Sequence, residues 1–155
     1  LNIIKEDNAS TVLQESLTCV GSSVCQFGIG DSMGLLQKIV EMEKHENFQD
    51  GILPKIYISG CPSSCGTHQT ALIGLQGAKK KVGNDVSNVF KIFIGGDEKQ
   101  GQEKFGDDLG AILEQDIPEM FKEAGKLVQQ TGLTFEEWYP SNSNVFIELV
   151  RKYLV

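Results

Sequence analysis

Apolar residues recur at helical spacing in two long stretches of the chain, which predicts helices there. The first stretch covers about residues 32–45, where Asp31 or Ser32 is a suitable N-cap. The second covers about residues 118–130 and ends at Gly132. In both stretches, the apolar stripe is typical of a helix face that packs against a core.

The C-terminal residues show the same helical periodicity in two shorter pieces. Residues 134–137, Thr-Phe-Glu-Glu, have the form of a capping box and predict a short turn. Ser141 or Asn142 is suited to cap a last helix whose apolar stripe ends near Tyr153.

Shorter runs of β-branched and aromatic residues predict strands between these helices. Two intervening segments are polar and are expected to be loops: residues 77–88, which contain three consecutive lysines, and residues 99–108. The expected strands cover residues 55–59, 70–75, 89–94 and a segment near 110–115, with a weak one at 11–13. Because no regular βαβ alternation is present, the order of elements favours an α+β fold, with a mixed sheet and flanking helices.

Composition narrows the class of protein. The chain has 155 residues, enough for one domain with a sizeable core. Fourteen basic residues stand against 21 acidic ones, which gives a net charge of −7 and argues against nucleic acid or an anionic membrane as a partner. The basic residues are almost all lysine, since Arg151 is the only arginine.

The N-terminus lacks the signature of an export signal. Residues 1–7 are short and acidic, where a signal peptide would have a basic flank and a long apolar core. We therefore expect a cytoplasmic protein whose cysteines are reduced or bind metal. The chain starts at Leu1, as an excised piece of a longer protein would. We expect residues 1–18 to be a lead-in and residues 19–155 to be the functional domain.

Candidate chemistry is concentrated in four cysteines. Cys19 and Cys25 have five residues between them in a segment rich in glycine and serine, and Cys61 and Cys65 follow a few dozen residues later. The second pair comes directly after a predicted strand. Pro62 suits the first position of a helix, so we expect a strand, a tight turn and a helix N-terminus, which would favour the thiolate form of the cysteines.

Three kinds of site are compatible with these cysteines. A structural zinc site usually draws on closer pairs than the wide spacing of Cys19 and Cys25. Two disulfides would suit an oxidising compartment. A [4Fe–4S] cluster needs four converging thiolates, with glycines for backbone clearance, and both cysteine segments supply these. The pattern favours the cluster, with Gly21, Gly28 and Gly30 giving the first segment its clearance.

The cysteine segments also carry a resemblance to a known family. The first reads Thr-Cys-Val-Gly from residue 18, and the second reads Ser-Gly-Cys-Pro-Ser-Ser-Cys-Gly-Thr-His-Gln over residues 59–69. Together they resemble the C-terminal half of the sirohaem-dependent nitrite and sulfite reductases. The resemblance continues through residues 73–77 and 93–96 and covers nearly the whole chain from Cys19 on. The Gly-Thr-His-Gln sequence is nearer the nitrite-reductase branch.

The resemblance implies a ligand set. Cys19, Cys25, Cys61 and Cys65 would each bind one iron of a [4Fe–4S] cluster, and Cys65 would also bridge to the iron of sirohaem. The neighbouring residues are candidates to line the sirohaem, with His68 acting either there or as an indirect donor; the candidates are Gly60, Ser64, Gly66, His68 and Gln69. The family commonly has asparagine where this chain has Ser64.

The implied activity is reduction of nitrite to ammonia or of sulfite to sulfide, with electrons from a ferredoxin or a flavoprotein. Sirohaem and these substrates are anionic and call for clustered arginines and lysines, which in the family come mostly from the N-terminal half. With Arg151 as its only arginine, this chain alone is expected to be inactive and to need that half as a partner. The alternative is a [4Fe–4S] electron-transfer module without sirohaem.

Overall fold

The computed structural model describes residues 11–155, and a five-stranded mixed sheet forms its centre. The first ten residues, which include the acidic N-terminal stretch and most of the expected lead-in, lie outside the described part. The strands lie side by side in chain order: β1 (Leu17–Thr18), β2 (Tyr57–Ser59), β3 (Ile73–Val82), β4 (Asp85–Ile94) and β5 (Asp107–Leu113). β1, β2 and β3 run parallel to one another, whereas β4 is antiparallel to β3 and β5 is antiparallel to β4.

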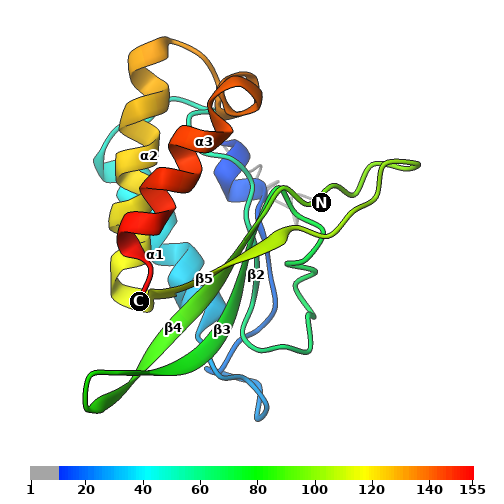
Figure 1. Ribbon diagram of the computed structural model, residues 1–155, viewed down its shortest axis with the longest axis vertical. Coiled ribbons are helices and arrows are strands. Elements are labelled where there is room, and N and C mark those ends of the chain that lie inside the picture. Colours follow the sequence, from blue (N-terminus) through cyan, green and yellow to red (C-terminus); the bar gives the residue numbers. More distant parts are fainter. Residues whose placement is uncertain (1–10) are drawn as a thin grey trace, which may run out of the picture.

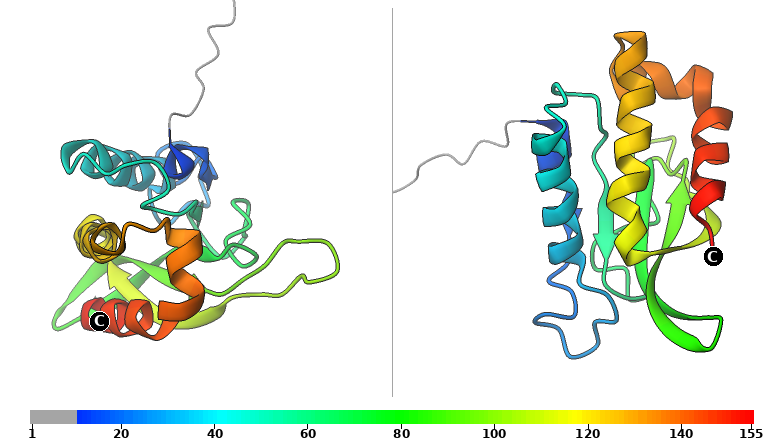
Figure 2. Two further views of the ribbon diagram at one scale, coloured as in Figure 1. Left: turned by 90° about the horizontal axis from the view of Figure 1, so that it is seen from above. Right: turned by 90° about the vertical axis from the view of Figure 1, so that its left-hand side faces the viewer.

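Three helices cover one face of this sheet (Figures 1 and 2): α1 (Ser32–His45), α2 (Ile117–Thr131) and α3 (Phe135–Tyr153). Two short 3₁₀ helices, η1 (Val12–Glu15) and η2 (Glu114–Asp116), precede β1 and α2. The α+β class with a mixed sheet and flanking helices is therefore confirmed. Among the described helices, none is long and apolar enough to cross a membrane.

The core lies between the helices and the sheet. Ile58, Leu75 and Ile92 are register partners on β2, β3 and β4, and all three are fully buried. They belong to one cluster with apolar side chains from all three helices, including Ile39 and Phe121. Paired residues of adjacent strands point to the same face, so these residues mark the helix-covered face.

Helix boundaries follow the local signals that predicted them. Asp31 caps α1 by accepting a hydrogen bond from the Gly34 N–H at 3.1 Å. Gly132 ends α2 in the left-handed conformation that glycine favours. Thr134 and Glu137 form the expected capping box. α3 is interrupted at Asn142, whose φ of −127° and ψ of 18° are not helical, so it consists of two helical segments that meet where the last helix was expected to start.

Two expectations about strands were wrong. Residues 11–13 do not form a strand, because Val12–Glu15 closes a 3₁₀ turn that buries Leu13 in the core. The three consecutive lysines lie on β3 and not in a loop, because β3 and β4 stay paired up to a tight turn at Gly83. This hairpin extends from the body of the molecule (Figure 1).

The expected helix after Pro62 is also wrong. Residues 60–72 form a series of turns that joins β2 to β3 without a helix. Ser64 and Thr67 have φ values of 58° and 48°, outside the right-handed helical region. The second cysteine pair therefore has no helix dipole beside it.

Candidate metal centre

The two cysteine segments leave the sheet at the same edge. β1 and β2 are parallel neighbours, with Thr18 in register with Ile58. Cys19 directly follows β1, and Cys61 follows β2 after one glycine. The pairing of the strands therefore brings two segments together that are far apart in the sequence.

Gly60 joins these two segments through its backbone. Its N–H donates to Cys19 Sγ at 3.1 Å, and its carbonyl accepts from the N–H groups of Ile29 and Gly30 at 2.9 and 2.8 Å. A Cβ at position 60 would lie 2.7 Å from the Gly30 carbonyl oxygen, closer than side chains tolerate. Only glycine fits there, which explains one residue of the motif.

The Cys19 thiol lies in surroundings that favour its thiolate form. Its Sγ is 3.3 Å from Ser32 Oγ, at the start of α1. Burial acts to raise the pKa of Cys19, but the hydrogen bonds with Ser32 and the Gly60 backbone outweigh it, so the pKa is lowered. Since the thiolate is the metal-binding form, this site is prepared for a ligand role.

The Cys25 segment is a compact loop with an apolar outer surface. The Cys25 N–H donates to the Gly21 carbonyl at 2.8 Å, which closes the turn. Val24 and Phe27, on either side of Cys25, are 72% and 83% exposed. The glycines of this loop leave space for other parts of the chain, since Gly30 packs on Phe90 and Gly21 on Ser32.

One of the four cysteines is more exposed than the others. Cys65 is exposed, whereas Cys19, Cys25 and Cys61 are half-buried. All four are free thiols, so the structure forms none of the disulfides that the sequence left open.

The remaining predicted site residues lie at different depths around Cys65. Gly60 and Gly66 are buried, and Ser64 and Gln69 are half-buried. His68 is fully buried, with Nδ1 2.9 Å from Ser59 Oγ and 3.4 Å from Ser64 Oγ. His68 has no exposed surface through which it could contact a macrocycle. Of the two roles expected for it, lining the sirohaem or acting as an indirect donor, this burial suits the second.

A tetrahedral zinc site would hold its four sulfurs about 3.8 Å apart, given Zn–S bonds of about 2.3 Å. Between residues 11 and 155, no three Cys, His, Asp or Glu side chains come together in a way that could hold a single metal ion. In a [4Fe–4S] cluster each thiolate binds a different iron, so the four sulfurs stand farther apart. Cluster thiolates also accept backbone N–H groups, as Cys19 Sγ does from Gly60.

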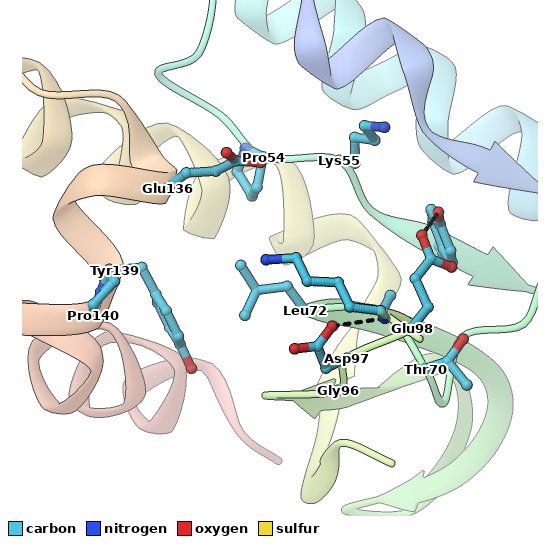
Figure 3. A pocket seen from close by; sticks show the side chains of 13 residues that line it. Pro54, Lys55, Thr70, Leu72, Gly96, Asp97, Glu98, Glu136, Tyr139 and Pro140 are labelled. Atoms are coloured by element: carbon cyan, nitrogen blue, oxygen red, sulfur yellow. Dashed lines mark hydrogen bonds between the residues drawn. The ribbon is translucent and has the colours of Figure 1, made fainter. Parts of the chain in front are cut away.

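A separate cavity of about 510 Å³ lies at the other end of β2 (Figure 3). Leu72, Asp97 and Glu98 line one side, and Glu136 and Tyr139, at the start of α3, line the other. None of the four cysteines contributes to it. The motif and this cavity are therefore distinct features of the molecule.

Sequence reasoning missed two residues that support the cysteines. Ser32 contacts Cys19, and Ser59 accepts a hydrogen bond from the Gly66 N–H at 3.0 Å. Ser32 was considered only as an alternative helix cap. Ser59 could have been found from its place in β2, since its neighbour Ile58 points to the core and Ser59 must point to the opposite face.

The chain is similar to known proteins in both sequence and fold. The model of the family described as nitrite and sulphite reductase 4Fe-4S domain matches residues 10–129, which include all four cysteines. An assimilatory-type sulfite reductase of Nitratidesulfovibrio vulgaris is 33% identical over 125 residues, and a ferredoxin–nitrite reductase of Leptolyngbya laminosa is 26% identical over 108. These alignments cover 81% and 69% of this chain.

The chain spans about half the length of the first relative and a fifth of the second, at 48% and 20%. Among solved structures, the NirA protein of Mycobacterium tuberculosis has a similar fold, with a TM-score of 0.59 and 20% sequence identity. That similarity covers 72% of this chain and 22% of NirA.

Proposed function

The chain belongs to the family of the nitrite and sulphite reductase 4Fe-4S domain, and we propose that it is the part of such a reductase that binds the cluster and sirohaem. Relatives of both kinds match, so the choice between nitrite and sulfite stays open. The leaning of the sequence toward the nitrite-reductase branch remains a prediction.

The observation that carries the proposal is the junction of the two cysteine segments. Cys19 Sγ accepts the N–H of Gly60, next to Cys61, so the first thiol of one pair touches the backbone of the other. N–H groups directed at sulfur stabilise cluster ligands. We propose Cys19, Cys25, Cys61 and Cys65 as the four ligands.

Cys65 is our candidate for the thiolate shared with the sirohaem iron. It is the exposed member of the set, so its sulfur is accessible from outside the chain. When bound, the two groups together would supply the electrons for reduction of nitrite or sulfite. We propose that four residues of this segment lie along the sirohaem: Gly60, Ser64, Gly66 and Gln69. His68, which is buried against the sheet, supports them from the side of the strands.

This chain supplies only one arginine for the anion binding that such a reaction needs. Arg151 lies on α3, 60% exposed at its side chain and paired with Glu148. The end of α3 approaches β5, the edge of the sheet opposite β1 and the first cysteine pair. We therefore propose that substrate binding and proton delivery come from the other half of the reductase, and that this chain alone is inactive.

An apolar surface beside the cysteines supports such a partner. Val20, Val24 and Phe27 are 50%, 72% and 83% exposed on the Cys25 loop. Exposed apolar groups of this size mark interaction surfaces. We propose that the N-terminal half of the reductase and the sirohaem cover them, in a cytoplasmic enzyme that receives electrons from a ferredoxin or a flavoprotein.

The test is an anaerobic titration of sirohaem into cluster-loaded protein, followed by the visible spectrum. The chain is measured alone and with the separately expressed N-terminal half of a matching reductase. We expect haem bands that titrate to saturation and are strengthened by the N-terminal half. Ser63→Ala, at an exposed position in the same segment, is the control and should bind as the parent does.

A cluster-loaded chain that never binds sirohaem, even with the N-terminal half present, would contradict the proposal. That result would favour an electron-transfer module that carries the cluster alone.

A further inference from the structure

The second face of the sheet, opposite the helices, carries a buried polar group centred on His68. Ser59 and Gln76 are register partners on β2 and β3, and both are buried. His68 lies against this face with its ring fully buried and its Nδ1 2.9 Å from Ser59 Oγ. Its ring also packs against Phe93 of β4, with the ring centroids 4.9 Å apart.

Ser59 connects this histidine to the cysteine segment. Its Oγ accepts the N–H of Gly66, the residue after Cys65, at 3.0 Å. One hydroxyl on a rigid strand therefore holds the segment at two points, Gly66 and His68. A Cβ at Gly66 would lie 2.2 Å from the Ile58 carbonyl oxygen, so the segment crosses β2 in direct backbone contact.

Short turns hold the rest of this segment, where the Thr67 and Thr70 N–H groups donate to the Ser64 and Thr67 carbonyls at 2.9 and 3.1 Å. Residues 60–72 contain no helix or strand, and both Ser64 and Thr67 have positive φ. Residues other than glycine rarely adopt this conformation, and it persists only where the surroundings enforce it. The bonds from Ser59 lie on either side of Thr67 and next to Cys65.

We propose that His68 is a positioning residue, which together with Ser59 fixes the backbone of the Cys61–Cys65 segment and so the directions of these two thiols. The role of the thiols in this inference rests on the proposed function. The bonds that Ser59 makes with Gly66 and His68, called the lock below, are present in the apo-protein. It adds Ser59 and His68 to the site as residues that act through Cys65.

Simple packing does not account for a histidine at this position. Nε2 of His68 is buried without a hydrogen-bond partner, which an apolar side chain of the same shape would avoid. Burial lowers the pKa of the ring, partly opposed by Gln76, so the ring is neutral. A ring in its neutral form, with Nδ1 at hydrogen-bond distance from Ser59 Oγ, is suited to holding that hydroxyl and not to carrying charge.

The first test is amide hydrogen exchange of Gly66 in the apo-protein, with Ser59→Ala, His68→Leu and His68→Asn. Asparagine keeps a hydrogen-bonding atom at the δ position, whereas leucine only fills the space. We expect Ser59→Ala and His68→Leu to lower the protection of Gly66 about tenfold, the ratio that corresponds to about 1.4 kcal/mol. His68→Asn should recover part of the protection, and core amides of β3 should be unaffected in all three variants.

The second test uses reconstituted protein and needs no enzyme activity. Iron release to a chelator should be about tenfold faster in Ser59→Ala and His68→Leu, with a changed EPR line shape of the reduced cluster. The exposed residue His45 offers a matched control, His45→Leu, which should change neither readout.

Unchanged Gly66 protection in Ser59→Ala would overturn the lock, whether or not any cluster binds. Equal effects of His68→Leu and His68→Asn would show that His68 acts only by filling space. That result would also overturn the proposal. If no variant and no parent protein takes up a cluster, the proposed function fails, while the amide data still decide the lock. If His68→Leu does not fold, Ser59→Ala decides alone.

Discussion

The two faces of the sheet are covered in different ways. On one face, Ile58, Leu75 and Ile92 pack against three helices in a continuous apolar cluster. On the other face, Ser59 holds a segment of turns through hydrogen bonds with Gly66 and His68. The same strands supply both sets of residues in alternation, so one sheet serves as both a core wall and a support for the candidate site.

The difference separates global stability from local order. Buried apolar area stabilises the whole domain, whereas a few hydrogen bonds hold only the segment that they touch. Changes on the helix-covered face should therefore lower the free energy of unfolding. Changes around the cysteine segments should mainly affect ligand binding.

The largest expected effect comes from the core. Leu75→Ala removes a fully buried side chain from the helix-covered face and should lower the free energy of unfolding by about 2–5 kcal/mol. Urea denaturation of the apo-protein measures it. Val86→Ala, at an exposed position on the adjacent strand, is the control and should stay within about 0.5 kcal/mol of the parent. A loss at Leu75 no larger than at Val86 would refute this division of the sheet.

A smaller effect on stability, with a large one on the site, is expected at Gly60. A Cβ there meets the Gly30 carbonyl oxygen at 2.7 Å, so Gly60→Ala must push the two cysteine segments apart. We expect about 1–3 kcal/mol of destabilisation and a loss of cluster uptake. Iron and sulfide content after reconstitution is the measurement, with Ser63→Ala as control. Full uptake by Gly60→Ala would show that the junction does not define the site.

A pH effect is expected from the charged residue buried in the helix layer. Glu43 is 2% exposed, with Oε2 accepting from Thr11 Oγ1 at 2.9 Å and Oε1 unpaired. Burial raises its pKa above the ordinary 4.5, so the fold favours the protonated form. This contribution to stability is fully present below pH 4.5 and is lost as pH rises through the raised value.

Glu43→Gln should remove that pH dependence. Relative to the parent, the variant should gain stability as pH rises above 4.5, reaching on the order of 1 kcal/mol, or about 2–4 °C in Tm. Thermal unfolding over a pH series measures the difference. A difference in Tm that does not vary with pH would contradict the assignment.

The smallest expected effect is a change in the pKa of one tyrosine, Tyr57 on β2, with Tyr153 at the end of α3 as the comparison. The hydrogen bond that Tyr57 donates to Glu98 raises the pKa of Tyr57 to about 12, and burial raises the pKa of Tyr153 to about 12. Glu98→Gln should lower the pKa of Tyr57 toward 10.0 and leave Tyr153 unchanged. Phenolate absorbance against pH records these two tyrosines together with Tyr139, and a curve identical to the parent's would rule out the Glu98 contact.

Helix-covered parts of the fold were predictable because their signals are local. Asp31 and Gly132 mark helix ends, and the apolar spacing of α1 and α2 gives their buried faces. The break of α3 at Asn142 was predictable in the same way, since Ser141 and Asn142 are suitable capping residues for a separate last helix.

The cysteine segments were harder to predict because tertiary contacts determine them. Pro62 indicated a helix, but Ser64 and Thr67 have positive φ, in a segment fixed through contacts with Ser59 on another element. The lysines of β3 have low strand propensity, and pairing with β4 overrides it. Motif spacing identified the cysteines, while the role of Ser59 required the sheet register.

The proposal that the four cysteines hold a [4Fe–4S] cluster is tested most directly by the iron, acid-labile sulfide and zinc content after anaerobic reconstitution of the apo-protein. One [4Fe–4S] cluster held by four thiolates predicts about four irons and four sulfides per chain and no zinc. Zinc without sulfide would contradict it and leave the four cysteines as ligands of a structural metal ion.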